Sequence, residues 1–238
     1  FKSFAKNISL CCDRKQGIYE TDFSIPVIKN FFNDDIQEKF LMFTYRNPKN
    51  ILNLSVKYYY DKFNISPVER EQNKIRCYNE TDGRVRKVIT NNEIDSIVQL
   101  ISNAASEDTI GIAAPRNEAV KYISEALSAR GIVNQKRYTV RVPGRQYPIV
   151  QVDLSFDENK VKIVTLWSAK GLQFDTVIIP YIDNETSPEY SGWTSKSGEG
   201  FALYVAMTRA KSNLYFTQTP DSSFPYDNYL DPDYYEDI

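Results

Sequence analysis

The chain has 238 residues, 42% of them hydrophobic and 25% charged, and carries a formal net charge of −2. This composition predicts a soluble globular protein with a sizeable core. The net charge argues against a protein that coats nucleic acid through its overall charge, but it does not exclude a local basic groove. The absence of histidine excludes Ser-His-Asp and Cys-His catalysis and imidazole-ligated metals, and we expect no metal site.

Apolar, β-branched segments alternate with helical patterns along the chain, which predicts a doubly wound α/β fold with a mainly parallel sheet. The expected strands are Ile8–Cys12, Phe40–Thr44, Thr109–Ala114, Ile149–Leu154, Val161–Leu166, Thr176–Pro180 and Asn213–Thr217. The expected helices are Ser24–Phe32, Asn47 to about Phe63, Asn91–Ala105, Asn117–Arg130 and Phe201–Ala210.

Three segments interrupt this alternation. Asn64 to about Lys87 is charged, and we predict irregular structure there. Gln135–Gln146 is basic around a turn at Pro143-Gly144 and is interpreted as a solvated hairpin. Pro220–Ile238 is rich in aspartate and tyrosine, which predicts a tail that is either frayed or docked on the surface.

Cysteine usage and the N-terminus suggest a compartment. Cys11, Cys12 and Cys77 form neither a disulfide framework nor a zinc motif, so we interpret them as reduced packing residues. No apolar run approaches the roughly 18 residues of a membrane span. The chain begins with neither a signal peptide nor methionine. We expect a fragment of a cytoplasmic protein.

Cationic and amide side chains lie at the ends of several expected strands. Gln16 follows the first strand and Arg46 the second, Lys170 follows Val161–Leu166, and Arg209 comes just before the last strand. Ligands of open α/β sheets bind beyond the carboxyl ends of strands, so we expect these side chains at one end of the sheet. Such a group suits a polyphosphate.

Four segments resemble, in order and spacing, motifs III to VI of superfamily 1 helicases of the UvrD/Rep type. They are "LCCDRKQGIY", "FTYRNPKNILNLS", "VTLWSAKGLQFDTVII" and "ALYVAMTRAKSNLYF". The resemblance extends from about Leu10 to Phe216. It implies a RecA-like sheet, with residues 1–34 ending a first RecA-like domain, 35–219 forming the second, and 220–238 forming an acidic, tyrosine-rich tail.

The resemblance also implies roles for individual residues. It implies ATP with magnesium, whose ligands would lie on an N-terminal ATPase half, and single-stranded or unwinding duplex DNA as partner. The implied catalytic residues are Arg209, Arg46 and Gln16; Tyr45, Gln173 and Gly171 would bind the nucleotide; Trp167, Lys170, Thr165 and Tyr19 would contact DNA.

The sequence departs from the family pattern at several positions. Trp167 replaces a histidine, Gln173 replaces a glutamate, and Thr21 and Asp22 replace an aromatic residue and an arginine of motif III. No Gly-x-x-x-x-Gly-Lys-Ser/Thr loop occurs in the sequence, and no magnesium-binding motif. We therefore expect no ATP hydrolysis by this chain alone.

Three functions remain open at this point, one of them a nucleotide-binding regulator with no nucleic-acid partner. The first is the C-terminal motor domain of an ATP-dependent DNA helicase or translocase. The second is a degenerate helicase-like module, without ATPase activity, that binds DNA or docks a protein in a larger defence or repair complex. Structural interpretations also remain: Arg209 could bond helix-end carbonyls, Trp167 could belong to the core, and Lys170-Gly171 could be a solvated turn.

Overall fold

The computed structural model describes residues 30, 43–72, 74–78, 81–140, 143, 149–155, 161–180, 198–220 and 226–237. The expected strand Ile8–Cys12 lies outside these residues, as do Gln16, Tyr19 and the expected helix Ser24–Phe32 apart from Asn30. Among the described helices, none is long and apolar enough to cross a membrane.

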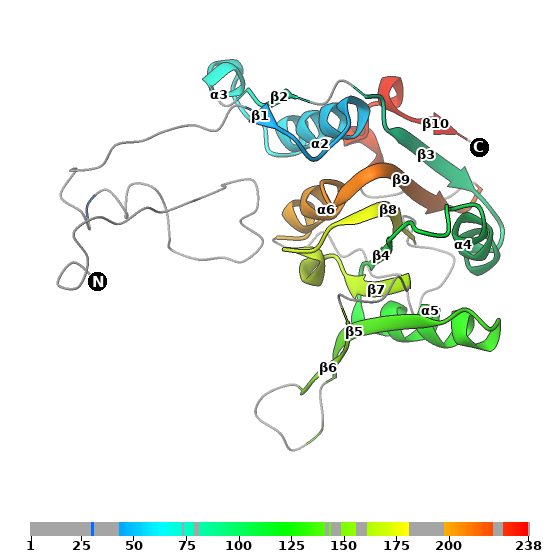
Figure 1. The fold of residues 1–238 in the computed structure, drawn as a ribbon. Helices are drawn as coiled ribbons and strands as arrows, with labels where there is room; N and C mark the ends of the chain where they lie inside the picture. Colours follow the sequence, from blue (N-terminus) through cyan, green and yellow to red (C-terminus); the bar gives the residue numbers. More distant parts are fainter. Residues whose placement is uncertain are drawn as a thin grey trace.

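An eight-stranded sheet forms the centre of the molecule (Figure 1). Neighbouring strands are parallel except for one antiparallel pair, β5 and β6. The predicted α/β class with a mainly parallel sheet is therefore confirmed. Across the sheet the strands are β10 (Glu236–Asp237), β3 (Arg84–Ile89), β9 (Ala210–Gln218), β8 (Phe174–Ile179), β4 (Ile110–Ala114), β7 (Val161–Thr165), β5 (Asn134–Val140) and β6 (Ile149–Asp153).

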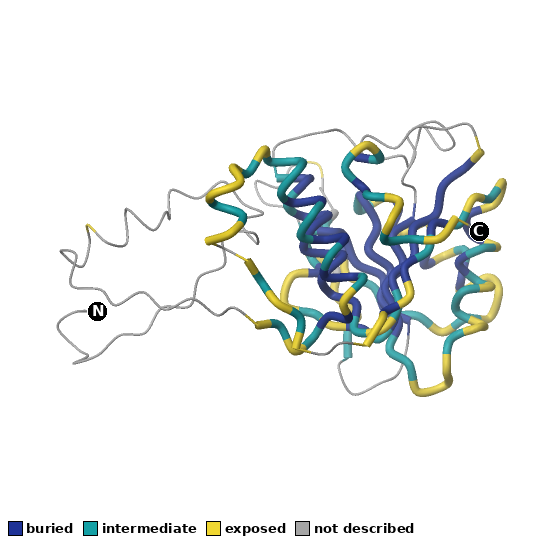
Figure 2. Tube along the Cα trace, turned by 90° about the horizontal axis from the view of Figure 1, so that it is seen from above, coloured by how far each residue is buried: buried dark blue, intermediate teal, exposed yellow. Residues whose placement is uncertain are grey.

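Helices cover both faces of the sheet, which makes the fold doubly wound. Successive residues of a strand point to opposite faces, and the strands are apolar on both. In β8, Val177 and Ile179 pack in the same cluster as residues of α2 (Lys49–Lys62) and α6 (Glu199–Met207). Ile178 packs in a second cluster, with residues of α4 (Glu93–Ser102) and α5 (Asn117–Ala129). Figure 2 shows the buried strands between these layers.

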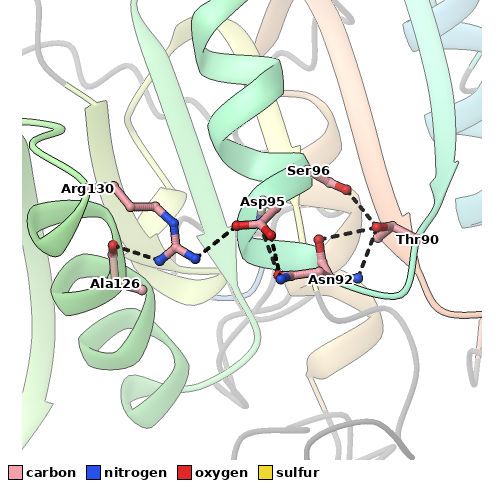
Figure 3. A network of polar contacts seen from close by, with 6 residues as sticks. All are labelled: Thr90, Asn92, Asp95, Ser96, Ala126 and Arg130. Carbon is pink, nitrogen blue, oxygen red and sulfur yellow. Dashed lines mark hydrogen bonds and ion pairs between the residues drawn. The ribbon is translucent and has the colours of Figure 1, made fainter.

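Polar contacts fix the start of α4 and join it to α5 (Figure 3). The Asn92 side chain accepts a hydrogen bond from the Asp95 backbone N–H at 3.1 Å, which caps the helix. Asp95 in turn pairs with Arg130 at 2.9 Å, just after α5. The predicted end of α5 at Gly131 is also confirmed, since this glycine has a φ of +77°.

The structure corrects the prediction of irregular structure between Asn64 and Lys87. This segment contains α3 (Pro67–Gln72), β2 (Arg76–Cys77) and most of β3. Strand β2 pairs with β1 (Phe43–Thr44) in a separate two-stranded sheet. The start of the basic segment, residues 135–140, lies in β5, which pairs with β6 in antiparallel orientation and with β7 in the main sheet.

The described part of the acidic tail, residues 226–237, is docked on the sheet and on α2. Tyr226 is buried, and its hydroxyl donates to the Glu199 carboxylate at 2.7 Å. Asp227 pairs with the buried Lys87 of β3 at 2.7 Å. Strand β10 then pairs with β3 and covers its outer edge. Burial first, and nearby acidic residues second, raise the pKa of Tyr235 to about 12.

Asp175 ties together the amino ends of β4, β8 and β9. Its carboxylate accepts hydrogen bonds from the backbone N–H and the hydroxyl of Thr109 at 2.9 and 2.6 Å, and from Lys211 Nζ at 3.0 Å. Burial alone would raise the pKa of Asp175. The hydrogen bonds from Thr109 and Lys211 outweigh that effect, so its pKa lies below the ordinary value.

We expect Asp175→Asn to reduce stability in a pH-dependent way. A lowered folded-state pKa means that the carboxylate stabilises the fold above the pKa of an unfolded aspartate, and that this stabilisation is lost as the pH falls through the folded-state pKa. The variant should lose about 1 kcal/mol of unfolding free energy at neutral pH. The loss should shrink once the pH falls below about 4.

Urea unfolding at pH 7 and pH 3 measures this difference. Asp82→Asn changes an exposed aspartate and serves as the control, with little change expected at either pH. A stability loss for Asp175→Asn that is equal at both pH values would contradict the assignment.

Candidate functional site

The turn between α6 and β9 holds Arg209 in a buried position. Helix α6 is buried along its whole length apart from Phe201, so its end is fixed by packing. The Arg209 residue is 3% exposed. Its guanidinium donates from Nε to the Val205 carbonyl at 3.0 Å and from Nη2 to the Thr208 hydroxyl at 3.0 Å. The guanidinium is therefore bonded to the last turn of its own helix.

The three carbonyls of this turn all accept hydrogen bonds from elsewhere in the chain. Asn47 Nδ2 donates to the Thr208 carbonyl at 3.0 Å and to the Ala210 carbonyl at 2.8 Å. The carbonyl between them, that of Arg209, accepts from the Phe174 backbone N–H at 3.0 Å. We call these five residues, Asn47, Phe174, Thr208, Arg209 and Ala210, the arginine junction. It joins the segment of Arg46 to the segment of Arg209.

Close packing fixes Phe174 at this junction. Its ring lies against Gly111 of β4, where an added Cβ atom would come within 2.2 Å of the ring. Only glycine therefore fits at position 111 without moving the ring. The residue before it, Gln173, is exposed, so its amide is presented to solvent beside the junction.

Exposed aromatic residues lie on one face of the small β1–β2 sheet. Phe43, Tyr45 and Tyr78 are 50%, 69% and 64% exposed, and Arg76 is exposed as well. Thr44 follows Phe43, and Cys77 follows Arg76. Both are half-buried, because successive residues of a strand point to opposite faces. The Tyr45 and Tyr78 rings are in contact, with centroids 4.4 Å apart and an interplanar angle of 39°. This aromatic face can stack on a planar base.

The loop after β7 carries the other predicted contacts. Thr165 ends β7, and its hydroxyl accepts from the Ser168 backbone N–H at 3.2 Å, which starts the short 3₁₀ turn η2 (Trp167–Ala169). Trp167 is half-buried and packs against the core. Lys170 and Gly171 are exposed, and Gly171 has a φ of +87°, which explains the glycine at this point in the loop.

The structure does not gather all predicted residues at the carboxyl ends of the strands. Thr165 pairs with Ala114, the last residue of β4, and so lies at the carboxyl end. Arg209 directly precedes β9 and is bonded to Phe174, the first residue of β8, so it lies at the amino end. The expectation of one shared end is wrong, because parallel strands require the chain to return to the other end of the sheet before each new strand begins.

Tyr45, Arg46 and Gln173 lie with Arg209 at the amino end, and the loop from Leu166 to Gln173 runs between the two ends. Gln16 and Tyr19 lie outside the described residues.

Sequence reasoning missed Asn47 and Tyr78. Asn47 was expected only as the start of a helix, and its bonds to residues 161 and 163 positions away leave no local pattern. Tyr78 lies in the segment expected to be irregular. The sequence marks Tyr78 only as a tyrosine among polar and charged residues.

Among the described residues, the site offers side chains that suit a planar base and an anion. Tyr45 offers an exposed ring, and Arg46, half-buried, offers a guanidinium next to it. Within the described ranges, no three His, Cys, Asp or Glu side chains are grouped so that they could hold a metal ion.

Sequence comparison places a helicase family on the second half of the chain. The family model of the UvrD-like helicase C-terminal domain matches residues 150–220, which run from β6 through β9. A protein of Bacillus subtilis (strain 168), YjcD, named as a candidate ATP-dependent DNA helicase, is 38% identical over 69 residues. This match covers 26% of the chain and 9% of YjcD, so the chain spans only a small part of its relative.

Structural comparison extends the likeness to most of the chain. The C-terminal domain of a possible DNA helicase from Lactobacillus plantarum WCFS1 superposes with a TM-score of 0.53 at 21% sequence identity, covering 82% of this chain and 98% of that structure. At this identity the likeness concerns the fold. Residues 150–220 are therefore similar to the UvrD-like helicase C-terminal domain, and the chain has the α/β RecA-like fold that its motifs predict.

Proposed function

We propose that the chain is the C-terminal motor domain of an ATP-dependent superfamily 1 DNA helicase or translocase. In this proposal residues 35–219 form the second RecA-like domain, and an N-terminal ATPase half supplies the phosphate-binding loop and the magnesium ligands. Tyr45 stacks on the adenine, Gln173 and Gly171 lie near the nucleotide, and Arg46 and Arg209 neutralise charge on the phosphoryl group during hydrolysis.

One observation carries this proposal: Asn47 joins the segments of the two arginines. Arg46 and Arg209 are far apart in sequence, yet the residue after Arg46 bonds the carbonyls on both sides of Arg209. The exposed Tyr45 ring lies beside Arg46 on the same segment. A base-stacking ring and two arginines carried by neighbouring segments match the needs of a nucleotide, whose base is planar and whose phosphates are anionic.

Single-stranded DNA would run over the other end of the sheet. Thr165 lies there, and the loop that starts at this residue also carries Trp167 and Lys170, so it supplies a hydroxyl, a half-buried aromatic ring and an exposed ammonium group. Aromatic rings that stack on bases and cations that contact phosphates are the usual components of single-strand binding. Since this loop ends at Phe174 in the arginine junction, movement at the nucleotide would reach the DNA contacts directly along the loop.

The burial of Arg209 favours a second candidate function. Its guanidinium already bonds the end of its own helix, as a purely structural arginine would. A helicase-like module that has lost ATP hydrolysis, and that binds DNA or docks a protein in a larger complex, would retain this contact. Turnover of the Arg209 variants separates the two functions.

We expect Arg209→Ala to lower ATP turnover of the intact polypeptide by roughly 10³-fold or more, the scale of arginine fingers. Arg209→Lys should restore little, because an ammonium group does not reproduce the planar fork of the guanidinium. Steady-state hydrolysis with saturating single-stranded DNA is the measurement. DNA affinity and the unfolding midpoint serve as controls, and a turnover within a few-fold of wild type would show that Arg209 is structural.

Trp167 should contribute to DNA binding through its ring. In a Trp193→Phe background, which leaves Trp167 as the single tryptophan, oligothymidine should quench the fluorescence. Trp167→Ala should weaken DNA binding by roughly 1–3 kcal/mol, whereas Trp167→Phe, which keeps a ring, should lose less. If both variants bind DNA as tightly as wild type, the tryptophan serves only the core.

A further inference from the structure

We propose that Asn47 is the positioning residue that sets the direction of the Arg209 guanidinium. This inference rests on the proposed function, because it concerns the same nucleotide site. It assigns a task to a residue that contacts neither the nucleotide nor DNA in that proposal. The task follows from what the Asn47 amide touches.

The Asn47 side chain is well placed to fix the backbone of Arg209. Asn47 is 4% exposed, and its single Nδ2 group donates both hydrogens, at 3.0 Å to the Thr208 carbonyl and at 2.8 Å to the Ala210 carbonyl. These carbonyls belong to the residues on either side of Arg209. The Thr208 carbonyl lies in the peptide group before Arg209 and the Ala210 carbonyl in the one after Ala210. Holding both limits rotation of the backbone between them, and hence the direction in which the Arg209 side chain leaves the chain.

Among uncharged side chains, a primary amide meets this requirement because its nitrogen donates two hydrogens. Two acceptors must be served from one position, and a hydroxyl has one hydrogen to give. Aspartate has the shape of asparagine, but when ionised it offers only acceptors, which would face two carbonyl oxygens. The choice of asparagine is thus tied to the two carbonyls, and the isosteric Asn47→Asp removes the bonds without opening a cavity.

Asn47 is itself anchored by its backbone. The Cys77 thiol donates to the Asn47 carbonyl at 3.1 Å, which ties Asn47 to β2. Pro48 follows as the N-cap of α2, and proline restricts the backbone conformation of the residue before it. The same residue therefore links the aromatic face, through Cys77, with the turn that carries Arg209. A nucleotide that contacts Tyr45 and Arg209 together would need a constant distance between the aromatic face and the turn that carries Arg209.

The first test reads the Arg209 side chain directly in the 238-residue chain. The Nε–H signal of Arg209 in a proton–nitrogen spectrum reports its bond to Val205 and is assigned by its loss in Arg209→Lys. We expect Asn47→Asp to shift or broaden this signal. Asn50→Asp is the matched control: it makes the same chemical change three residues away, where the amide is half-buried and lies 3.4 Å from the Gly83 carbonyl. An unchanged Arg209 signal in Asn47→Asp overturns the proposal.

The second test measures turnover in the intact polypeptide. Asn47→Asp should lower kcat for ATP by roughly 10- to 100-fold with little change in KM, the cost expected for a misplaced group, whereas Asn50→Asp should not. In an Arg209→Ala background the same change should cost less than about twofold, because the guanidinium it positions is gone. An equal loss in both backgrounds would mean a general structural role and overturn the proposal.

The two tests also separate this inference from the proposed function. If Arg209→Ala leaves turnover intact, the proposed role of Arg209 fails, while the Nε–H signal still decides whether Asn47 holds Arg209. If Asn47→Asp does not fold, Asn47→Ser is used instead. Its hydroxyl can serve one carbonyl, so we expect a smaller change in the Arg209 signal and in kcat, and no change in either would again overturn the proposal.

Discussion

The turn from Thr208 to Ala210 is the point on which the candidate site depends. A helix end leaves its last carbonyls without partners, and here the turn is buried, so water cannot serve them. Asn47 and Phe174 provide the missing donors from two other parts of the chain. Leaving a buried acceptor without a partner costs about 1–3 kcal/mol. Helix α6, strands β8 and β9 and the segment of Arg46 are thus held together by the need to satisfy three carbonyls.

The small net charge of the protein does not reflect the short-range pairing of its acidic and basic side chains. The net charge of −2 combines 29 basic and 31 acidic side chains, and many of these pair at short range. In the described tail, Asp227 and Glu236 neutralise Lys87 and Arg86 of β3. Strand β10 at the same time covers an edge of the sheet, which would otherwise be open to pairing with another chain. Residues 226–237 of the acidic tail are therefore part of the folded domain.

The sequence predicts those elements whose signals are local. Strands β4, β7 and β8 are runs of apolar, β-branched residues, and α5 has both a helical period and a terminal glycine, so all four are recognisable within a few residues. Strand β3 is different, because its sequence, RVRKVI, reads as charged. It becomes a strand through non-local contacts: β9 and β10 pair with its edges, and Asp227, 140 residues away, neutralises its buried Lys87. Such partners cannot be read from the segment itself.

The same distinction applies to the candidate site. Motif order identifies Arg46 and Arg209, but their arrangement depends on Asn47, whose bonds span more than 160 residues. The two arginines also differ in a way that no motif records: Arg209 is almost fully buried, whereas Arg46 is half-buried. A guanidinium that is already bonded and oriented loses little entropy when a phosphate reaches it, whereas a more exposed one can move toward the phosphate. If both act on ATP, the Arg209 guanidinium therefore stays in place while the Arg46 side chain moves toward the phosphate. The arginine junction then keeps the two segments at a constant separation.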